Sequence, residues 1–174
     1  MNRLNTREVV FAGLLIGMFV ILNYWLSIPI TPTLIIKFGF LPLAFMSMLI
    51  GPLLGGAGAV VGDVIGAVSF PQGPFFFGFT VSAFVTGIIY GLFLYKKPKT
   101  VLRIFAAVAC VTLLVDFGLN TYWLTLLYGD GFFVLLPGRI VKGLAMVPVQ
   151  VAVIYTVWRY AGAMIEKRYI QDRT

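Results

Sequence analysis

Histidine is absent from this sequence, and cysteine occurs once, at Cys110. Without histidine the chain lacks the commonest general base and the usual zinc and haem ligand, which argues against most hydrolytic or metal-dependent chemistry. The single cysteine lies in an apolar stretch and offers no start for a disulfide framework or a metal-ligand cluster. No Gly-x4-Gly-Lys-Ser/Thr phosphate loop occurs either, so the chain does not itself hydrolyse ATP. We therefore expect no enzyme, no metal site and no cofactor.

Charged residues are also scarce. They make up 11% of the 174 residues, against roughly 25% in an ordinary soluble domain, and 60% of the chain is hydrophobic. The net charge of +7 comes from basic residues at the ends of apolar segments rather than along an aromatic-studded polar face, so we expect no nucleic-acid partner. They form three groups: Arg3 and Arg7; Lys96, Lys97, Lys99 and Arg103; and Arg159, Lys167, Arg168 and Arg173. This is the positive-inside pattern of a protein embedded in the lipid bilayer.

Six apolar segments are candidates for membrane spans, since a transmembrane helix needs about 20 apolar residues. They cover approximately 8–28, 34–50, 53–67, 76–95, 101–128 and 132–160. Pro29 closes the first, and Gly51-Pro52 separates the second from the third, because proline and glycine interrupt helices. No small-x-small cleavage site follows the first run, so we expect it to be retained. The sequence thus predicts an all-α polytopic membrane protein, one membrane domain over residues 1–174 with six transmembrane helices.

The orientation follows from the basic loop 96–103, which we place in the cytoplasm. Both termini are then cytoplasmic, and the outer loops 29–36, 69–75 and 128–131 carry no charge except Asp130. An odd number of spans would leave one basic terminus outside. We therefore expect a multi-pass protein of the bacterial cytoplasmic membrane.

Small residues recur at intervals of four in the third segment, in two rows: Gly55 and Ala59, and Gly58, Gly62 and Gly66. Within lipid, helices are held together by close backbone approach, which small residues permit. The rows predict a tightly packed central helix. Gly13 and Gly17 in the first segment, and Gly87 and Gly91 in the fourth, suggest the same.

Ionisable residues fall within the drawn spans, at Lys37, Asp63, Asp116, Arg139 and Lys142. A charge in hydrocarbon costs at least a few kcal/mol, so such a residue normally faces a partner, a bundle interior or a water-filled cavity. The predicted topology places all but Asp116 in the outer half of the membrane, with Asp116 near the middle of its helix.

The spacing of these residues shows which of them share a helical face. Asp116, Asn120 and Trp123 share one helical face at i, i+4 and i+7, and Arg139 and Lys142 share another at i and i+3. The two faces can converge on one outward-opening cavity whose balance of charge suits an anionic ligand. The alternative is that the charges only pair with one another, Asp63 with Lys142 and Asp116 with Arg139.

The loop SFPQGPFFF, residues 69–77, allows two interpretations. Its phenylalanines could anchor it at the membrane edge, or the loop could be a hydrophobic lid over a flat ring. We favour the lid, because Pro71, Gly73 and Pro74 shape a compact cap.

Five stretches in this order form a specific set: GFLPLAFMSMLIGPLLGG (39–56), GDVIGA (62–67), FPQGPFFFGFTVSAFVTGIIYGLFLY (70–95), GLNTYWL (118–124) and LLPGRIVKGLAMVPVQ (135–150). Together they resemble the folate-specific substrate-binding components of energy-coupling factor transporters. The resemblance implies a six-helix protein that captures a vitamin from outside. It also implies association with a transmembrane coupling subunit and two cytoplasmic ATPases, and reorientation in the membrane to release the vitamin inward.

The resemblance also implies roles for particular residues. The amino and ring N–H groups of a pterin would be accepted by Asp63, Asp116 or Asn120, and its flat ring would lie between aromatic walls. These walls are Trp123, Phe76 and Phe77; the two carboxylates of the glutamate tail match Arg139, Lys142 and Lys37. Members of this family dock on the coupling subunit through small residues of the first helix, which here are Ala12, Gly13 and Gly17.

Three other functions remain open from the sequence. The same scaffold could bind another anionic vitamin, such as pantothenate or biotin. A membrane-embedded enzyme acting on lipid would need a nucleophile or a metal site, for which the sequence offers no candidate. A purely structural membrane protein would use its buried polar residues for stability and bind no ligand.

Overall fold

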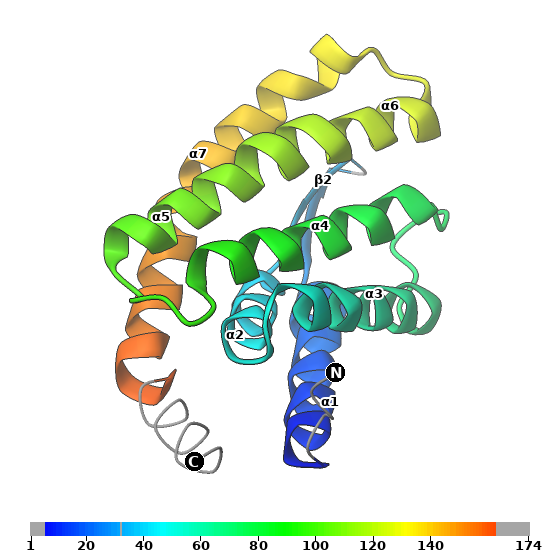
Figure 1. The fold of residues 1–174 in the computed structure, drawn as a ribbon. Coiled ribbons are helices and arrows are strands. Elements are labelled where there is room, and N and C mark those ends of the chain that lie inside the picture. Colours follow the sequence, from blue (N-terminus) through cyan, green and yellow to red (C-terminus); the bar gives the residue numbers. More distant parts are fainter. Residues whose placement is uncertain (1–5, 32, 163–174) are drawn as a thin grey trace.

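The computed structural model describes residues 6–31 and 33–162, which form a bundle of helices around one small β-hairpin (Figure 1). In chain order the elements are α1 (Thr6–Val20), η1 (Ile21–Trp25), β1 (Ile28–Thr31), β2 (Leu34–Ile36), α2 (Phe40–Ile50), α3 (Pro52–Ser69), α4 (Phe77–Leu94), α5 (Val101–Cys110), η2 (Val111–Asn120), α6 (Thr121–Tyr128), α7 (Phe132–Val157) and η3 (Trp158–Gly162). The basic residues Arg3, Lys167, Arg168 and Arg173 of the predicted topology lie outside the described residues.

The elements join into six helical runs, because the π-helical segments η1, η2 and η3 continue the α-helices beside them. The runs cover 6–25, 40–50, 52–69, 77–94, 101–128 and 132–162. Within the described part of the chain, four helices are long and apolar enough to cross a membrane: Pro52–Ser69, Phe77–Leu94, Val101–Tyr128 and Phe132–Tyr160. The apolar parts of the other two runs, Val9–Trp25 and Phe40–Ile50, are shorter. The prediction of a mostly helical, membrane-embedded fold is confirmed.

The second predicted helix was drawn too long, since it begins at Phe40 and not at residue 34. Residues 34–36 instead form β2, which pairs antiparallel with β1 in the register Ile28↔Ile36 and Pro29↔Ile35. β-branched residues dominate both strands and favour extended backbone. Pro29, which has no N–H to donate, stands in a two-stranded hairpin whose strands are both edges.

The central helix α3 packs as closely as its glycines predict. A Cβ on Gly62 would lie 2.6 Å from the ring of Phe19, and one on Gly58 would lie 2.6 Å from the sulfur of Met46. The contact with α4 is between backbones, since a Cβ on Gly87 would lie 2.7 Å from the Cα of Gly56. These distances are too short for any side chain, which explains the glycines on both helices.

Gly13 and Gly17 differ from the packed glycines of α3 and α4, and the prediction that they pack closely as those do is wrong. Both are exposed on α1, and a Cβ on either would have no atom within 4 Å. Their helix turns Leu15 and Phe19 toward the core instead. Gly13 and Gly17 therefore leave a shallow open strip on the outer face of α1.

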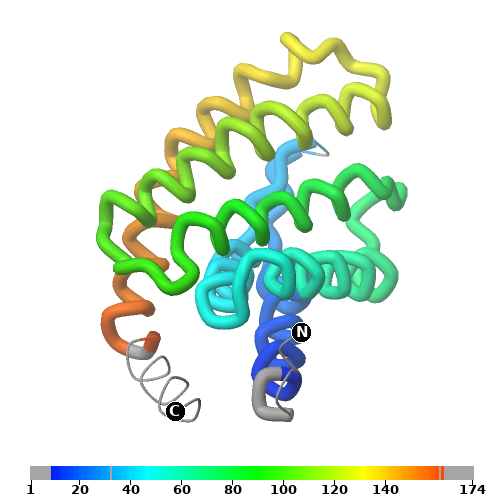
Figure 2. The backbone as a smooth tube through the Cα atoms, viewed as in Figure 1, coloured from blue at the N-terminus to red at the C-terminus, as the bar shows by residue number. Residues whose placement is uncertain are grey.

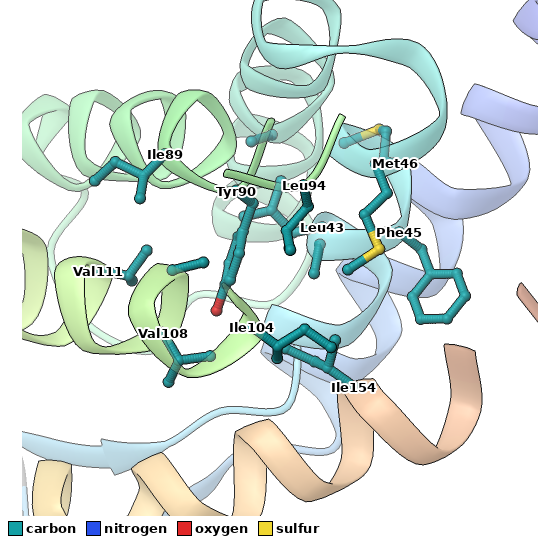
Figure 3. Packing of buried hydrophobic residues seen from close by; sticks show 14 of the residues in the cluster. Leu43, Phe45, Met46, Ile89, Tyr90, Leu94, Ile104, Val108, Val111 and Ile154 are labelled. Atoms are coloured by element: carbon teal, nitrogen blue, oxygen red, sulfur yellow. The ribbon is translucent and has the colours of Figure 1, made fainter. Parts of the chain in front are cut away.

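The apolar core lies where α2, α4, α5 and α7 converge, and Figure 3 shows Leu43, Tyr90, Ile104 and Ile154 among its members. Beside this core, the Nζ of Lys99 lies 4.6 Å from the centre of the Trp158 ring, so the loop 95–100 meets the start of η3. Figure 2 shows the start of α1 and η3 in the lower part of the view, and the hairpin and the 128–132 connection in the upper part.

We expect Gly87→Ala to lower the stability of the protein in detergent. The added methyl group would meet the backbone of α3, and overpacking of this kind costs about 1–3 kcal/mol. The matched control is Gly17→Ala, where the methyl group enters open space and alanine favours the helix. Thermal unfolding should show a lower midpoint for Gly87→Ala only; equal midpoints would contradict the close packing of α3 and α4.

Candidate functional site

A cavity of about 290 Å³ opens between the hairpin, the loop 70–76 and the helices. Its walls come from η1, α3, α4, η2 and α7, and β2 borders it through Ile35. Seven of the nine predicted binding residues line it: Lys37, Asp63, Phe76, Asp116, Asn120, Arg139 and Lys142. Residues that are far apart in the sequence are thus brought to one space.

Asp63 is buried, with 6% of its surface exposed, and both of its carboxylate oxygens accept hydrogen bonds. The Tyr24 hydroxyl donates to Oδ1 at 2.5 Å, and the Thr80 hydroxyl donates to Oδ2 at 2.8 Å. The Tyr24 ring fits against Gly66, where a Cβ would lie 2.2 Å from the ring. Sequence reasoning missed Tyr24 and Thr80. Gly66, one helical turn after Asp63, could have indicated that a large side chain packs beside this carboxylate.

The two cations of α7 bind backbone carbonyls. Arg139 donates from Nε to the Asp116 carbonyl at 3.2 Å and from Nη1 to the Thr33 carbonyl at 3.4 Å. Lys142 donates from Nζ to the Ile35 carbonyl at 2.6 Å. Thr33 and Ile35 belong to the hairpin, so both cations hold non-helical backbone in place.

The alternative in which the buried charges simply pair is wrong for these residues. Lys37, Asp63, Asp116, Arg139 and Lys142 are all described, and no cation among them lies within ion-pair distance of a carboxylate among them. Arg139 does meet Asp116, but at the main-chain oxygen and not at the carboxylate. Within the described residues, neither Arg139 nor Lys142 therefore forms an ion pair with a carboxylate.

Asp116 and Asn120 lie in η2, and their side chains bond to one another, Asn120 Nδ2 donating to Asp116 Oδ1 at 3.1 Å. The Asp116 carbonyl also accepts from the Thr121 hydroxyl at 3.0 Å. The carbonyl oxygen of the Asn120 amide is buried and has no hydrogen-bond partner. This atom and Asp116 Oδ2, for which no protein donor occurs among the described residues, each have acceptor capacity that the described chain does not use.

The aromatic wall differs from the prediction. Phe76 lines the cavity, but Trp123 lies behind it, with ring centres 5.7 Å apart, and donates from Nε1 to the Ser82 hydroxyl at 3.1 Å. The i, i+7 spacing that placed Trp123 beside Asp116 assumes an α-helix, whereas η2 is π-helical and turns less per residue. Phe77 is also not a wall residue. It begins α4, is 67% exposed, and follows Phe76 on a different face.

The loop 70–76 borders the cavity, as the lid interpretation expects. Pro74, Phe75 and Phe76 all line it. The loop is fastened to η1 by Gln72, whose Nε2 donates to the Tyr24 carbonyl at 2.8 Å and to the Ser27 hydroxyl. Beside this contact the Nζ of Lys37 lies 4.9 Å from the centre of the Tyr24 ring. Gln72 was another residue that sequence reasoning missed.

The fold and the site define a class: a helical membrane protein with an internal, partly apolar cavity that carries unpaired positive charge, as expected for a binder of small anionic molecules. Residues 7–158 match the family described as "ECF transporter, substrate-specific component", and the chain belongs to this family. Its members are transporter components, which agrees with the prediction that the chain is not an enzyme.

Named relatives agree with this assignment. The chain is 40% identical over 165 residues to the folate transporter FolT of Clostridium novyi (strain NT), covering 95% of this chain and 93% of that protein. It is 33% identical over 159 residues to the folate transporter FolT of Leuconostoc mesenteroides, covering 88% and 85%. A crystal structure of FolT bound with folic acid superposes with a TM-score of 0.83 at 35% identity, covering 88% of this chain and 93% of that one.

We expect Tyr24→Phe to destabilise the protein by about 1–3 kcal/mol, because the Asp63 carboxylate would lose one of its two side-chain donors while staying buried. The matched control is Tyr160→Phe, since Tyr160 is 74% exposed. Thermal unfolding of both variants in detergent checks this. If Tyr24→Phe unfolds at the midpoint of the control, the bond to Asp63 does not contribute to stability.

Proposed function

We propose that this chain is the folate-binding component of an ATP-driven importer, which captures folate from outside the cell in the cavity and releases it inward together with a coupling subunit and two ATPases. One observation carries the proposal. Arg139 and Lys142 line the cavity, and both donate their hydrogen bonds to neutral backbone carbonyls. The names of the two relatives, both folate transporters, and the folic-acid-bound structure support the choice of ligand.

The ligand chemistry suits the cations. Each carboxylate of a glutamate tail makes stronger, charge-assisted hydrogen bonds than a backbone carbonyl does. Arg139 has donors beyond the two that it uses, and Lys142 uses one of three. Both can therefore bind a carboxylate while keeping a contact with the hairpin. Lys37 is a third cation on the same cavity.

The pterin has candidate partners on the other walls. Asp116 Oδ2 and the carbonyl oxygen of the Asn120 side chain have no protein donor within the described chain and can accept from an amino group and a ring N–H side by side. Each oxygen of Asp63 accepts one side-chain donor and keeps capacity for another. Phe76 gives the flat ring an apolar surface.

The topology that we propose has six crossings and both termini in the cytoplasm. The eleven residues of α2 measure only about 16 Å, roughly half of a hydrocarbon core. The second crossing is completed by β2 and the two residues that follow it, Leu34 to Phe38, which add at most about 16 Å at 3.3 Å per residue. Non-helical backbone is tolerated at membrane depth where it lines a cavity and has polar partners, as Ile35 does here.

The open strip on α1 is the docking surface that we propose for the coupling subunit. Gly13 and Gly17 are exposed and have no neighbour, and Ala12 beside them is half-buried. In lipid, helices associate where small residues allow the backbones to approach. A second transmembrane helix could therefore lie against α1 at this strip, and the ATPases would act through it.

We expect Arg139→Gln to weaken folate binding more than it weakens binding of pteroate, which lacks the glutamate. Loss of a charge-assisted contact to a carboxylate is worth about 1.5–3 kcal/mol, or roughly ten- to a hundredfold in Kd. The comparison of the two ligands distinguishes two causes of weaker binding. Loss of the contact to the glutamate affects folate alone, whereas a displaced hairpin would weaken both ligands equally. Arg159→Gln, at an exposed residue outside the cavity, is the control.

The binding measurement is a titration of detergent-purified protein. The role of Arg139 would be refuted by equal losses for the two ligands. Folate specificity itself would be refuted if the wild-type protein gave no binding signal with folate and a clear one with riboflavin or thiamine. Mass spectrometry of copurified small molecules would then identify the ligand.

We expect Gly17→Trp to abolish copurification with the coupling subunit and to leave the Kd for folate unchanged, because the indole fills the open strip and Gly17 does not line the cavity. Leu144→Trp is the control, an equally bulky residue at a 67% exposed position on α7. The readout is the yield of coupling subunit recovered with a tagged chain after coexpression. Wild-type recovery with Gly17→Trp would place the docking surface elsewhere.

A further inference from the structure

Lys37 differs from the other two cations of the cavity, because its ammonium group makes no hydrogen bond to the described part of the chain. Arg139 and Lys142 both donate to carbonyls of the hairpin. The Nζ of Lys37 instead lies 4.9 Å from the centre of the Tyr24 ring. An aromatic face attracts a cation but occupies none of its N–H donors. The described residues therefore leave all three donors of Lys37 unused, in a side chain that lines the cavity.

The Tyr24 ring that faces Lys37 is held in a fixed position. Its hydroxyl donates to Asp63 Oδ1 at 2.5 Å and lies 3.1 Å from the main-chain oxygen of the same residue. Gly66 leaves room for the ring, since a Cβ there would overlap it. The Tyr24 carbonyl accepts from Gln72 Nε2 at 2.8 Å, and the residue is only 8% exposed. Tyr24 thus presents an immobile aromatic face to the cavity cation.

Asp63 is the carboxylate that attracts Lys37 most strongly. Its charge acts on the Lys37 ammonium more than the charges of Lys142 and Asp116 do. Lys37 and Asp63 nevertheless form no ion pair, since none of their nitrogen–oxygen distances falls within 4.0 Å. Tyr24 contacts both of them, Asp63 with its hydroxyl and Lys37 with its ring. One neutral side chain therefore supplies a partner to each of two opposite charges that would otherwise attract one another.

We propose that Tyr24 is a positioning residue, which keeps Lys37 from pairing with Asp63 and so holds its ammonium group ready for a carboxylate of the ligand. The proposal rests on the function proposed above, since it takes the ligand to be a pterin with an anionic tail. A lysine held by a ring keeps its donors for charge-assisted hydrogen bonds to that tail. Without the ring, Lys37 and Asp63 would pair, and the cavity would lose one of its three cations.

The test is Tyr24→Leu, measured as the preference for folate over pteroate, which lacks the glutamate. We expect this ratio of the two Kd values to fall about ten- to a hundredfold, the value of one hydrogen bond to a charged group. Lys37→Gln should lower the preference by the same factor. The double variant should lower it no further, because both substitutions remove the same contact with the ligand.

Asp63→Asn distinguishes a positioning role of Tyr24 from a packing role. It removes the carboxylate that would capture Lys37, so Tyr24→Leu combined with Asp63→Asn should regain most of the preference for folate. A loss caused by packing alone would not be regained. The matched control is Tyr155→Leu, which removes a partly buried ring packed against the core and outside the cavity. It should lower the unfolding midpoint and leave the preference unchanged.

A second comparison covers the case in which Tyr24→Leu does not fold. Tyr24→Phe is compared with a trifluorinated phenylalanine introduced at the same position by nonsense suppression. The two rings have nearly the same shape, but fluorine depletes the negative face that attracts a cation, so only the fluorinated ring should lower the preference for folate. Equal preferences for the two rings would overturn the proposal.

Two results with Tyr24→Leu would also overturn it: a wild-type preference for folate, or a loss that Asp63→Asn does not restore. Failure of the proposed function is seen separately, as a wild-type protein that binds neither folate nor pteroate.

Discussion

The structure depends on one constraint of the membrane environment: backbone that is not helical must find its hydrogen bonds within the protein. The hairpin β1–β2 is the segment to which this applies, and Arg139 and Lys142 of α7 donate to its carbonyls at Thr33 and Ile35. Because two cations perform this task, the hairpin brings positive charge to the cavity that it borders. The interaction that stabilises the extended segment is thus the same one that prepares the site for an anion.

The buried negative charge of Asp63 is stabilised by side-chain hydroxyls. Asp63 receives hydroxyls from Tyr24 and Thr80, so its negative charge is stabilised by neutral donors from two other helices. Full ion pairs would have been costly to desolvate and would have cancelled the field of the cavity. By stabilising each charge with neutral groups, the protein keeps cations and carboxylates available in one small space. A ligand that carries both carboxylates and donor groups can use both.

Much of the fold could be predicted from the sequence. Long apolar runs and basic residues at their ends predicted helices over 76–95, 101–128 and 132–160, which agree with the structure to within a few residues. The glycine rows of α3 predicted a tightly packed helix, and the structure packs it closely against α4. The second helix was drawn too long because Leu34, Ile35 and Ile36 are as apolar as a membrane span, and hydropathy does not distinguish extended chain from helix.

The sequence by itself determined which charged residues reach the cavity, because a charged side chain within an apolar run has few other places to go; Lys37, Asp63, Asp116, Arg139 and Lys142 all line the cavity. Only the tertiary structure decided what each of them contacts. Arg139 binds the carbonyl of Asp116 and not its carboxylate, and Trp123 stands behind Phe76 because η2 is π-helical. Burial cost is a property of the residue and can be read locally, whereas hydrogen-bond partners depend on angles and distances between segments that lie up to 107 residues apart in the chain.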